Sequence, residues 1–466
     1  MATLIEQHPL YTTLTVGQDI IFTVSNSLIL SNPLFTNVKF IAEVRVSSGL
    51  PPNSSENTDV VGTFKTTPNN AGVGMFDFRP ILESFVNSDN LASVNSQYKT
   101  TTLTSDTVVP IHLIDKFSQN KNALSYLIVK FKIEYIDNGN LVTGEERDSN
   151  LFNIFNGYLK YTDILDLSNN NFGYNIPDKF TLDPDGELLS NAPTTQYANI
   201  IDYGTLSFLA INTFPSKIRF IYYNSSDVQL GLEYVEFTSA NGGFGALSSE
   251  ANKRLYYFGC FPANLRNWST IFNSPAVIDN IEGGYYTVET LREPFTSLAP
   301  KYTINVNCPT LKGYDPIRLC WLNQWGAWDY YTFTMKSSKM ISTKGSTYQQ
   351  LEGSWNESTY KINGFKGGKK AFRVNATEKI SMNTDFISEA ESEWFEELIN
   401  SPEVYILEGF QSDLNLSSLN IPAMNQYVTP TRLTTSSYTK KTVANDKLIQ
   451  YTFEVEKSKT LRTQAV

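Results

Sequence analysis

The residues that most often carry out chemistry in proteins are scarce in this chain. Among its 466 residues there are two histidines, His8 and His112, and three cysteines, Cys260, Cys308 and Cys320. A catalytic triad, a His/Cys zinc site or a facial iron site would each have to use one of the two histidines. The cysteines show no CxxC spacing, and His112 lies in the strand-like run VPIHLI. We therefore expect no catalytic histidine or cysteine, no metal and no cofactor.

Carboxylates are the remaining candidates for acid–base chemistry. The chain has 47 Asp and Glu residues, so close pairs must occur. Glycoside hydrolysis needs two carboxylates at a defined separation in space, which spacing along the sequence does not give. The run LDPDGELL at 182–189 alternates acidic residues but lacks the glycine and the glutamate of an EF-hand at their required positions. We predict that the chain is not an enzyme, and keep a glycosidase as an alternative.

The most unusual stretch is RLCWLNQWGAWDYYTFTM, residues 318–335, which holds half of the six tryptophans. Strand propensity on both sides of NQWGAW, with Gly326 at the turn, predicts a hairpin. Both of its faces are apolar, so we expect it to be covered on both sides. Three interpretations stay open: the central strands of one sandwich, a surface covered by another domain or subunit, and an exposed sugar platform with Trp325 at its tip.

Of these interpretations we take the interface as the working hypothesis, because aromatic anchors dominate protein interfaces. The predicted interface residues are Trp321, Trp325, Trp328, Tyr330, Phe333 and Trp394.

Composition and charge exclude several classes of protein. With 37 basic and 47 acidic residues the net charge is −10, which disfavours a nucleic-acid binder. The start MATLIEQHPLYTTL has no signal-peptide pattern, and no apolar run is long enough for a membrane span. We expect a soluble protein without a membrane span.

Period-two alternation dominates the first three quarters of the chain and predicts a mainly β fold. Turn-rich segments divide it into tandem β-sandwich domains followed by a C-terminal α+β domain. The predicted domains are a sandwich with one short helix at 1–165, a second sandwich at 166–340, and the α+β domain at 341–466. The short helix is expected within GMFDFRPILESFVNS, residues 74–88, with Pro80 near its first turn.

The run SEAESEWFEELINSP predicts the clearest helix of the chain. Ser388 is a suitable N-cap, with Glu391 three residues later, and Pro402 follows the last turn. A strand, EVYILEG, is expected directly after it.

A glycine-lysine run, FKGGKK at 365–370, could be mistaken for a phosphate-binding loop. It lacks the G-x-x-x-x-G-K-[ST] order and a strand-to-helix context. We interpret it as a Gly-Gly hairpin tip with a basic rim.

Three of these segments together resemble a known group of proteins. They are the motif Asn323-x-x-Gly326-x-Trp328-Asp329-Tyr330-x-x-Phe333, the helix and strand of 388–409 with the closing strand at 448–456, and the segment TFKTTPNNAGVGMFDFRPILESFV at 63–86. They look like tail or neck structural proteins of tailed bacteriophages, especially crAss-like and related phages that infect Bacteroidota.

That resemblance implies a virion protein of the tail, assembled in the host cytoplasm as a ring, hub or adaptor. It implies a homo-oligomeric ring and contacts with other virion tail proteins, with DNA at most passing through an acidic lumen. The alternative is a host-recognition module that binds surface glycans through the aromatic stretch.

Overall fold

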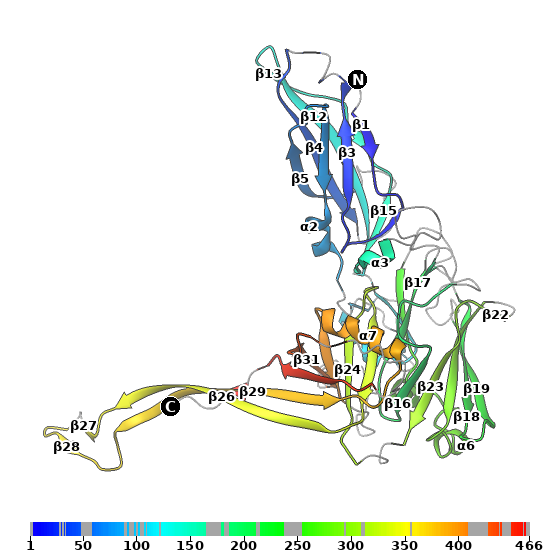
Figure 1. Cartoon of the computed structure of the whole chain (residues 1–466), viewed down its shortest axis with the longest axis vertical. Helices are drawn as coiled ribbons and strands as arrows, with labels where there is room; N and C mark the ends of the chain where they lie inside the picture. The colour runs from blue at the N-terminus through cyan, green and yellow to red at the C-terminus, as the bar shows by residue number, and fades with distance from the viewer. Residues whose placement is uncertain are drawn as a thin grey trace. The chain divides into compact units, whose positions relative to one another are not determined.

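The computed structural model shows a mainly β protein built from several sheets (Figure 1). It describes residues 3–47, 58–87, 111–164, 179–236, 254–308, 313–408 and 427–462, with short gaps inside several of these ranges, and four short strands between 91 and 108. Among these residues no helix is both long and apolar enough to cross a membrane.

Two sheets formed by the first 155 residues enclose one core. The smaller sheet has the order β1 (Leu4–Gln7), β3 (Ile21–Ser25), β6 (Val73–Asp77). The larger has the order β2 (Thr13–Thr15), β15 (Phe152–Phe155), β12 (Leu124–Asp137), β4 (Thr36–Ser47), β5 (Val60–Thr66), with β13 (Asn140–Thr143) and β14 (Arg147–Asp148) also paired to β12.

Alternation along β4 explains this packing. Its side chains Phe40, Ala42 and Val44 are fully buried in the core that the two sheets share. Glu43 and Arg45 occupy the positions between and beyond them, and therefore point to the outer face of the sheet.

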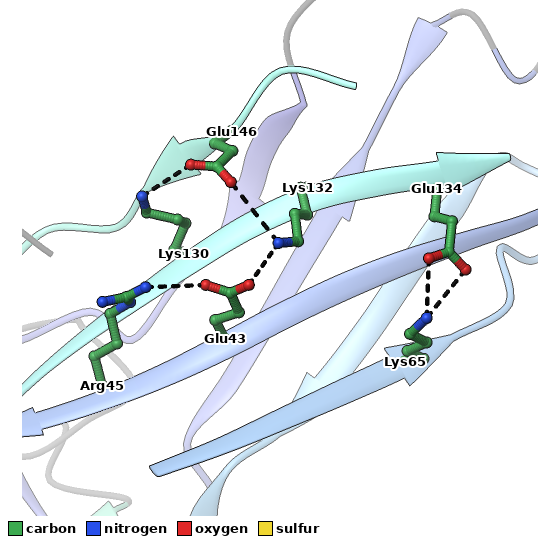
Figure 2. A network of polar contacts seen from close by, with 7 residues as sticks. All are labelled: Glu43, Arg45, Lys65, Lys130, Lys132, Glu134 and Glu146. Carbon is green, nitrogen blue, oxygen red and sulfur yellow. Dashed lines mark hydrogen bonds and ion pairs between the residues drawn. The ribbon is translucent and has the colours of Figure 1, made fainter. Parts of the chain in front are cut away.

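That outer face carries a ladder of ion pairs across three strands (Figure 2). Glu43 accepts hydrogen bonds from Arg45, at 3.1 Å, and from Lys132 on β12. Its pKa lies below the usual value, chiefly because of the hydrogen bond from Lys132. Three further pairs complete the ladder: Lys130–Glu146 at 2.8 Å, Lys132–Glu146 at 3.8 Å and Lys65–Glu134 at 2.9 Å.

The predicted short helix near residue 80 is confirmed. It consists of α2 (Arg79–Leu82), with Pro80 in its first turn, followed by the 3₁₀ turn η2 (Glu83–Phe85). Leu82 and Val86 are buried in the core of the first two sheets.

Two more sheets follow, in agreement with the mainly β fold that the sequence predicts. One has the order β10 (Thr107–Val108), β7 (Leu91–Ala92), β11 (Phe117–Asn120), β20 (Arg254–Gly259), β17 (Thr205–Ala210), with β8 (Gln97–Tyr98) and β9 (Thr101–Thr102) beside it. The other has the order β16 (Thr195–Asn199), β23 (Tyr302–Asn307), β21 (Tyr285–Arg292), β18 (Lys217–Tyr223), β19 (Gln229–Glu236), with β22 (Thr296–Ser297) paired to β21. Short helical turns between the strands are η3 (Ile111–Leu113), α3 (Tyr161–Ile164), α5 (Pro262–Trp268) and α6 (Pro275–Ile278).

The last large sheet contains the aromatic hairpin. Its order is β25 (Trp328–Phe333), β24 (Ile317–Leu322), β30 (Val404–Leu407), β31 (Val428–Leu433), β32 (Thr452–Lys457), β29 (Gly368–Asn383), β26 (Ser337–Gln350), with β33 (Leu461–Arg462) paired to β29. A two-stranded sheet, β27 (Gly353–Ser354) and β28 (Lys361–Ile362), lies between β26 and β29 in the chain.

The predicted C-terminal helix is confirmed as α7 (Glu389–Asn400). Ser388 caps it: the hydroxyl accepts from the Glu391 amide, and the Glu391 carboxylate accepts from the Ser388 amide. Both orphan N–H groups are satisfied locally, which is why the sequence alone located this helix.

The described residues form two compact units. The first takes in Met1–Cys308 and Leu322–Asp329, and the second Pro309–Trp321, Tyr330–Glu408 and Gln426–Val466. These units do not follow the boundaries at 165/166 and 340/341, because β11 pairs with β20, and the hairpin 317–333 contributes its tip to the first unit and its strands to the second. The three domains stay a prediction.

The ion-pair ladder predicts a pH-dependent contribution to stability. Because the pKa of Glu43 is depressed in the folded chain, the pair stabilises above the unfolded value of 4.5, and this contribution is lost as the pH falls through the folded pKa. We expect Glu43→Gln to lower the free energy of unfolding by about 0.5–1 kcal/mol at pH 7. The difference should shrink in acid and in concentrated salt.

The control is Glu145→Gln, an exposed carboxylate that makes no ion pair with any described residue. Urea unfolding across the pH range measures both variants. An equal loss for the two, or a loss of Glu43→Gln that persists in acid, would contradict the assignment.

Candidate interaction sites: a buried hairpin tip and an exposed arm

The tip of the aromatic hairpin is organised by the amide of Asn323. Its Oδ1 accepts hydrogen bonds from the backbone N–H groups of Trp325 and Ala327, both at 3.0 Å. Its Nδ2 donates to the Leu189 carbonyl at 2.9 Å and to Asp329 Oδ1 at 3.1 Å. Both N–H donors of this buried amide have partners, and its oxygen accepts two hydrogen bonds from the turn, so the turn conformation is fixed.

Gly326 is required at this turn for two reasons. Its φ of +71° is a left-handed conformation, and a Cβ atom there would lie 1.7 Å from the Asn156 carbonyl oxygen. The backbone of the first unit therefore packs directly against the turn. Tyr257 adds a hydrogen bond from its hydroxyl to the Gly326 carbonyl, at 3.2 Å.

The two tryptophans of the tip are also held by the first unit. Trp325 Nε1 donates to Asn191 Oδ1 at 3.0 Å, and its ring meets Phe180 edge-on at 4.7 Å. Trp328 meets the buried His112 ring edge-on at 4.8 Å. His112 lies in the 3₁₀ turn η3, so the strand-like interpretation of VPIHLI was wrong, although its contact with a neighbour is present.

The strand residues of the hairpin are buried within the second unit instead. Trp321 lies 4.8 Å from Trp394 of α7, and Phe395 contacts Tyr331 at 4.9 Å and Phe453 at 5.2 Å. One face of α7 thus packs its aromatic rings on the sheet, as expected of an amphipathic helix.

All six predicted interface residues are buried by the chain itself. The largest exposed fraction among them is 4%, and that of Trp325 is 1%; the six are Trp321, Trp325, Trp328, Tyr330, Phe333 and Trp394. A contact with a second subunit needs side chains that are exposed in the single chain, so their assignment to an interface is corrected to an internal core. The sugar platform at this hairpin is wrong for the same reason.

Groups capable of other chemistry are dispersed. Among the described residues no three His, Cys, Asp or Glu side chains are close enough together to hold a metal ion. The three cysteines are free thiols, and burial raises the pKa of Cys320 well above its usual value. A thiol of this kind stays protonated and unreactive.

One half-buried carboxylate escaped the sequence analysis because Glu233 falls at an ordinary polar position of β19. It accepts hydrogen bonds from Tyr222 and from Ser269, whose Oγ lies 2.6 and 2.7 Å from its oxygens. Burial raises the pKa of Glu233, and these hydrogen bonds oppose the shift. Ser269 in turn accepts from the Phe272 amide at 2.8 Å, so the group braces the end of α5.

A two-stranded arm, defined here as residues 337–383, exposes most of its side chains to solvent. β26 and β29 pair antiparallel from Ser337↔Met382 to Gln350↔Gly368, with a bulge after Ser346. Among the described residues, strands other than β26 pair with β29 only over residues 375–376 and 379–383, so the outer part of the arm is a lone ribbon in the described chain (Figure 1).

Large apolar side chains are exposed along the arm. Ile362 and Phe365 are 72% and 80% exposed. Others of this kind are Met340, Ile341, Leu351, Tyr360 and Phe372. A single hairpin is marginal in water and cannot bury these groups itself, so the arm is the candidate docking surface of the described chain.

The run FKGGKK was predicted as a Gly-Gly hairpin tip, and this prediction was wrong. The run joins β28 to β29, and these two strands pair with β27 and β26, not with each other. Gly367 and Gly368 have φ values of +97° and +76°, where the chain enters β29. Lys366, Lys369 and Lys370 surround them, and all three are exposed.

Comparison with known proteins identifies no family. No protein-family model matches the chain, and no curated protein matches it. Among solved structures, Escherichia coli alpha-2-macroglobulin aligns with 81% of this chain and 21% of its own length, at 10% identity and a TM-score of 0.18. The chain thus spans about a fifth of that protein, and a similarity this low supports no argument.

Burial of the hairpin within the chain makes a prediction that separates a core from an interface. We expect Trp328→Ala to lower the free energy of unfolding of the first unit by about 3–5 kcal/mol, because it leaves a large cavity beside His112. Tyr161→Ala, at a largely exposed side chain, is the control. A Trp328→Ala chain that keeps its unfolding midpoint and loses only assembly would restore the interface interpretation.

The arm predicts the opposite behaviour. Replacing Ile362, Phe365 and Phe372 with serine should change the free energy of unfolding by less than about 0.5 kcal/mol for each substitution, since these side chains are already in water. It should also reduce binding of a hydrophobic dye to the native protein. Phe333→Ser, which empties a buried position, shows that the assay responds to a core change. A large loss from the triple variant would mean that the arm is covered in the free chain.

Proposed function

We propose that this chain is a structural subunit of a tailed-bacteriophage virion, assembled in the host cytoplasm into the tail or neck. In this proposal it works through contacts with copies of itself and with other tail proteins, and it catalyses no reaction. The resemblance of the segments 63–86, 323–333 and 388–409 to tail proteins supports this assignment.

One observation carries the proposal: the arm exposes apolar side chains on a ribbon that has no core of its own. Isolated ribbons of this kind gain stability when a partner covers them, because burial contributes roughly 25 cal/mol per Å² of apolar surface. An assembly subunit meets such a partner in every particle.

The fold that we propose is more detailed than the mainly β architecture described above. We propose tandem β-sandwich domains followed by an α+β domain at 341–466. Two features support this type of fold: the shared core of the first two sheets supports a sandwich, and the aromatic face of α7 against the last sheet supports an α+β domain. That sheet also includes β24 and β25, which precede residue 341.

Purified particles test the proposed function. In particles from a culture that produces this chain, mass spectrometry should find it at a fixed ratio to the major capsid protein. When the triple serine variant of the arm is the only copy supplied, we expect folded protein in the lysate and at least about tenfold less in the particles.

The matched control carries Leu4→Ser and Leu141→Ser, two substitutions of equally exposed apolar residues outside the arm. It should enter particles normally. Particles that lack the wild-type chain would exclude a virion role, and normal entry of the triple variant would remove the arm from the proposal.

A further inference from the structure

Charge is divided unequally between the arm and the first unit. Of the 37 Lys and Arg and 47 Asp and Glu residues, the arm holds eight basic and three acidic, a net charge of +5. Residues 1–308 and 322–329 hold 19 basic and 31 acidic, a net charge of −12. One chain therefore carries a basic arm and an acidic first unit.

Six of the eight basic side chains lie where the arm is a lone ribbon, and these six are exposed. They are Lys344, Lys361, Lys366, Lys369, Lys370 and Arg373. Only Lys361 among them forms an ion pair with a described carboxylate, that of Glu357 at 3.8 Å. Tyr348 and Phe372 meet edge-on at 6.4 Å in the same segment, so charged and apolar groups alternate over a short distance.

This mixture defines the chemistry of the partner. The lysines can form ion pairs with carboxylates or phosphates, whereas Ile362, Phe365 and Phe372 can be buried only against an apolar surface. A nucleic-acid backbone supplies only the first. A protein surface that is acidic and partly apolar supplies both.

We infer that the arm of one copy docks on the acidic first unit of a second copy, an inference that rests on the proposed structural function. The first unit has the complementary charge and its own exposed apolar side chains, among them Tyr197, Val228 and Phe295. Pairing of two arms is disfavoured, because it brings +5 against +5, and lysines on an edge strand oppose edge-to-edge pairing.

Such a contact is head-to-tail: the donating and receiving surfaces differ, and a pair of copies keeps one free arm and one free receiving surface. Repetition closes a ring or extends a filament, according to the rotation between neighbours.

A shortened chain tests the inference. Residues 345–374 are replaced by Asn-Gly, which joins the paired residues Lys344 and Asn375 through a two-residue turn. By sedimentation at about 50 mM salt, the full chain should form oligomers, and the shortened chain should stay monomeric. A mixture should form complexes containing both, because the shortened chain still offers its acidic unit.

Charge reversal provides the second variant, since exposed lysines are not needed for folding. Lys366→Glu, Lys369→Glu and Lys370→Glu together should weaken association at least about tenfold, as should 0.5 M salt for the full chain. Replacing the three lysines with arginine is the control and should preserve association.

Three outcomes would overturn the inference. They are a full chain that remains monomeric, a shortened chain that never joins the full chain, and an arm that binds duplex DNA while copies do not associate. None of these bears on whether the chain is present in purified particles, so failure of this inference and failure of the proposed function are distinguishable.

Discussion

Complete hydrogen bonding of one buried amide, that of Asn323, organises the centre of the first unit. The side chain fixes the turn at Trp325 and Ala327 and at the same time reaches Leu189 and Asp329. A buried amide without partners would cost about 1–3 kcal/mol for each lost hydrogen bond, so these segments are bound to one arrangement. The aromatic rings of the tip then pack around a turn whose conformation is already set.

The arm follows the opposite logic. The pairing of β26 with β29 satisfies the backbone groups that face the partner strand, but the side chains of the arm have no core to enter. The strands of the arm are thus ordered although their side chains are not buried. The apolar and basic side chains stay available to a partner. In an assembling protein the rest of the chain can then fold before the contact forms. Burial of the exposed apolar side chains of the arm stabilises the contact and not the free chain.

Local patterns were sufficient wherever the deciding interaction lies within a few residues. The capping box at Ser388 and Glu391 and the proline-led turn at Pro80 were predicted for this reason. The glycines at 367–368 were wrongly predicted as a hairpin tip, because the strand that each side of the run pairs with lies elsewhere in the chain. His112 was placed in a strand because hydrophobicity in VPIHLI does not distinguish a strand from a 3₁₀ turn. The arm was not predicted as a lone ribbon. The sequence of a strand does not show whether a third strand pairs with it, so isolated and flanked strands look alike.

The sequence by itself determined a mainly β chain, a hairpin apolar on both faces and a scarcity of histidine and cysteine. Only the tertiary structure decided what covers that hairpin: Asn156, Asn191 and His112 at its tip, and α7 on its strands. Periodicity reports which side chains leave water, whereas the identity of the covering segment depends on contacts between residues far apart in the sequence. A pattern of buried aromatics is therefore the same for a core and for an interface, and the fold alone separates the two.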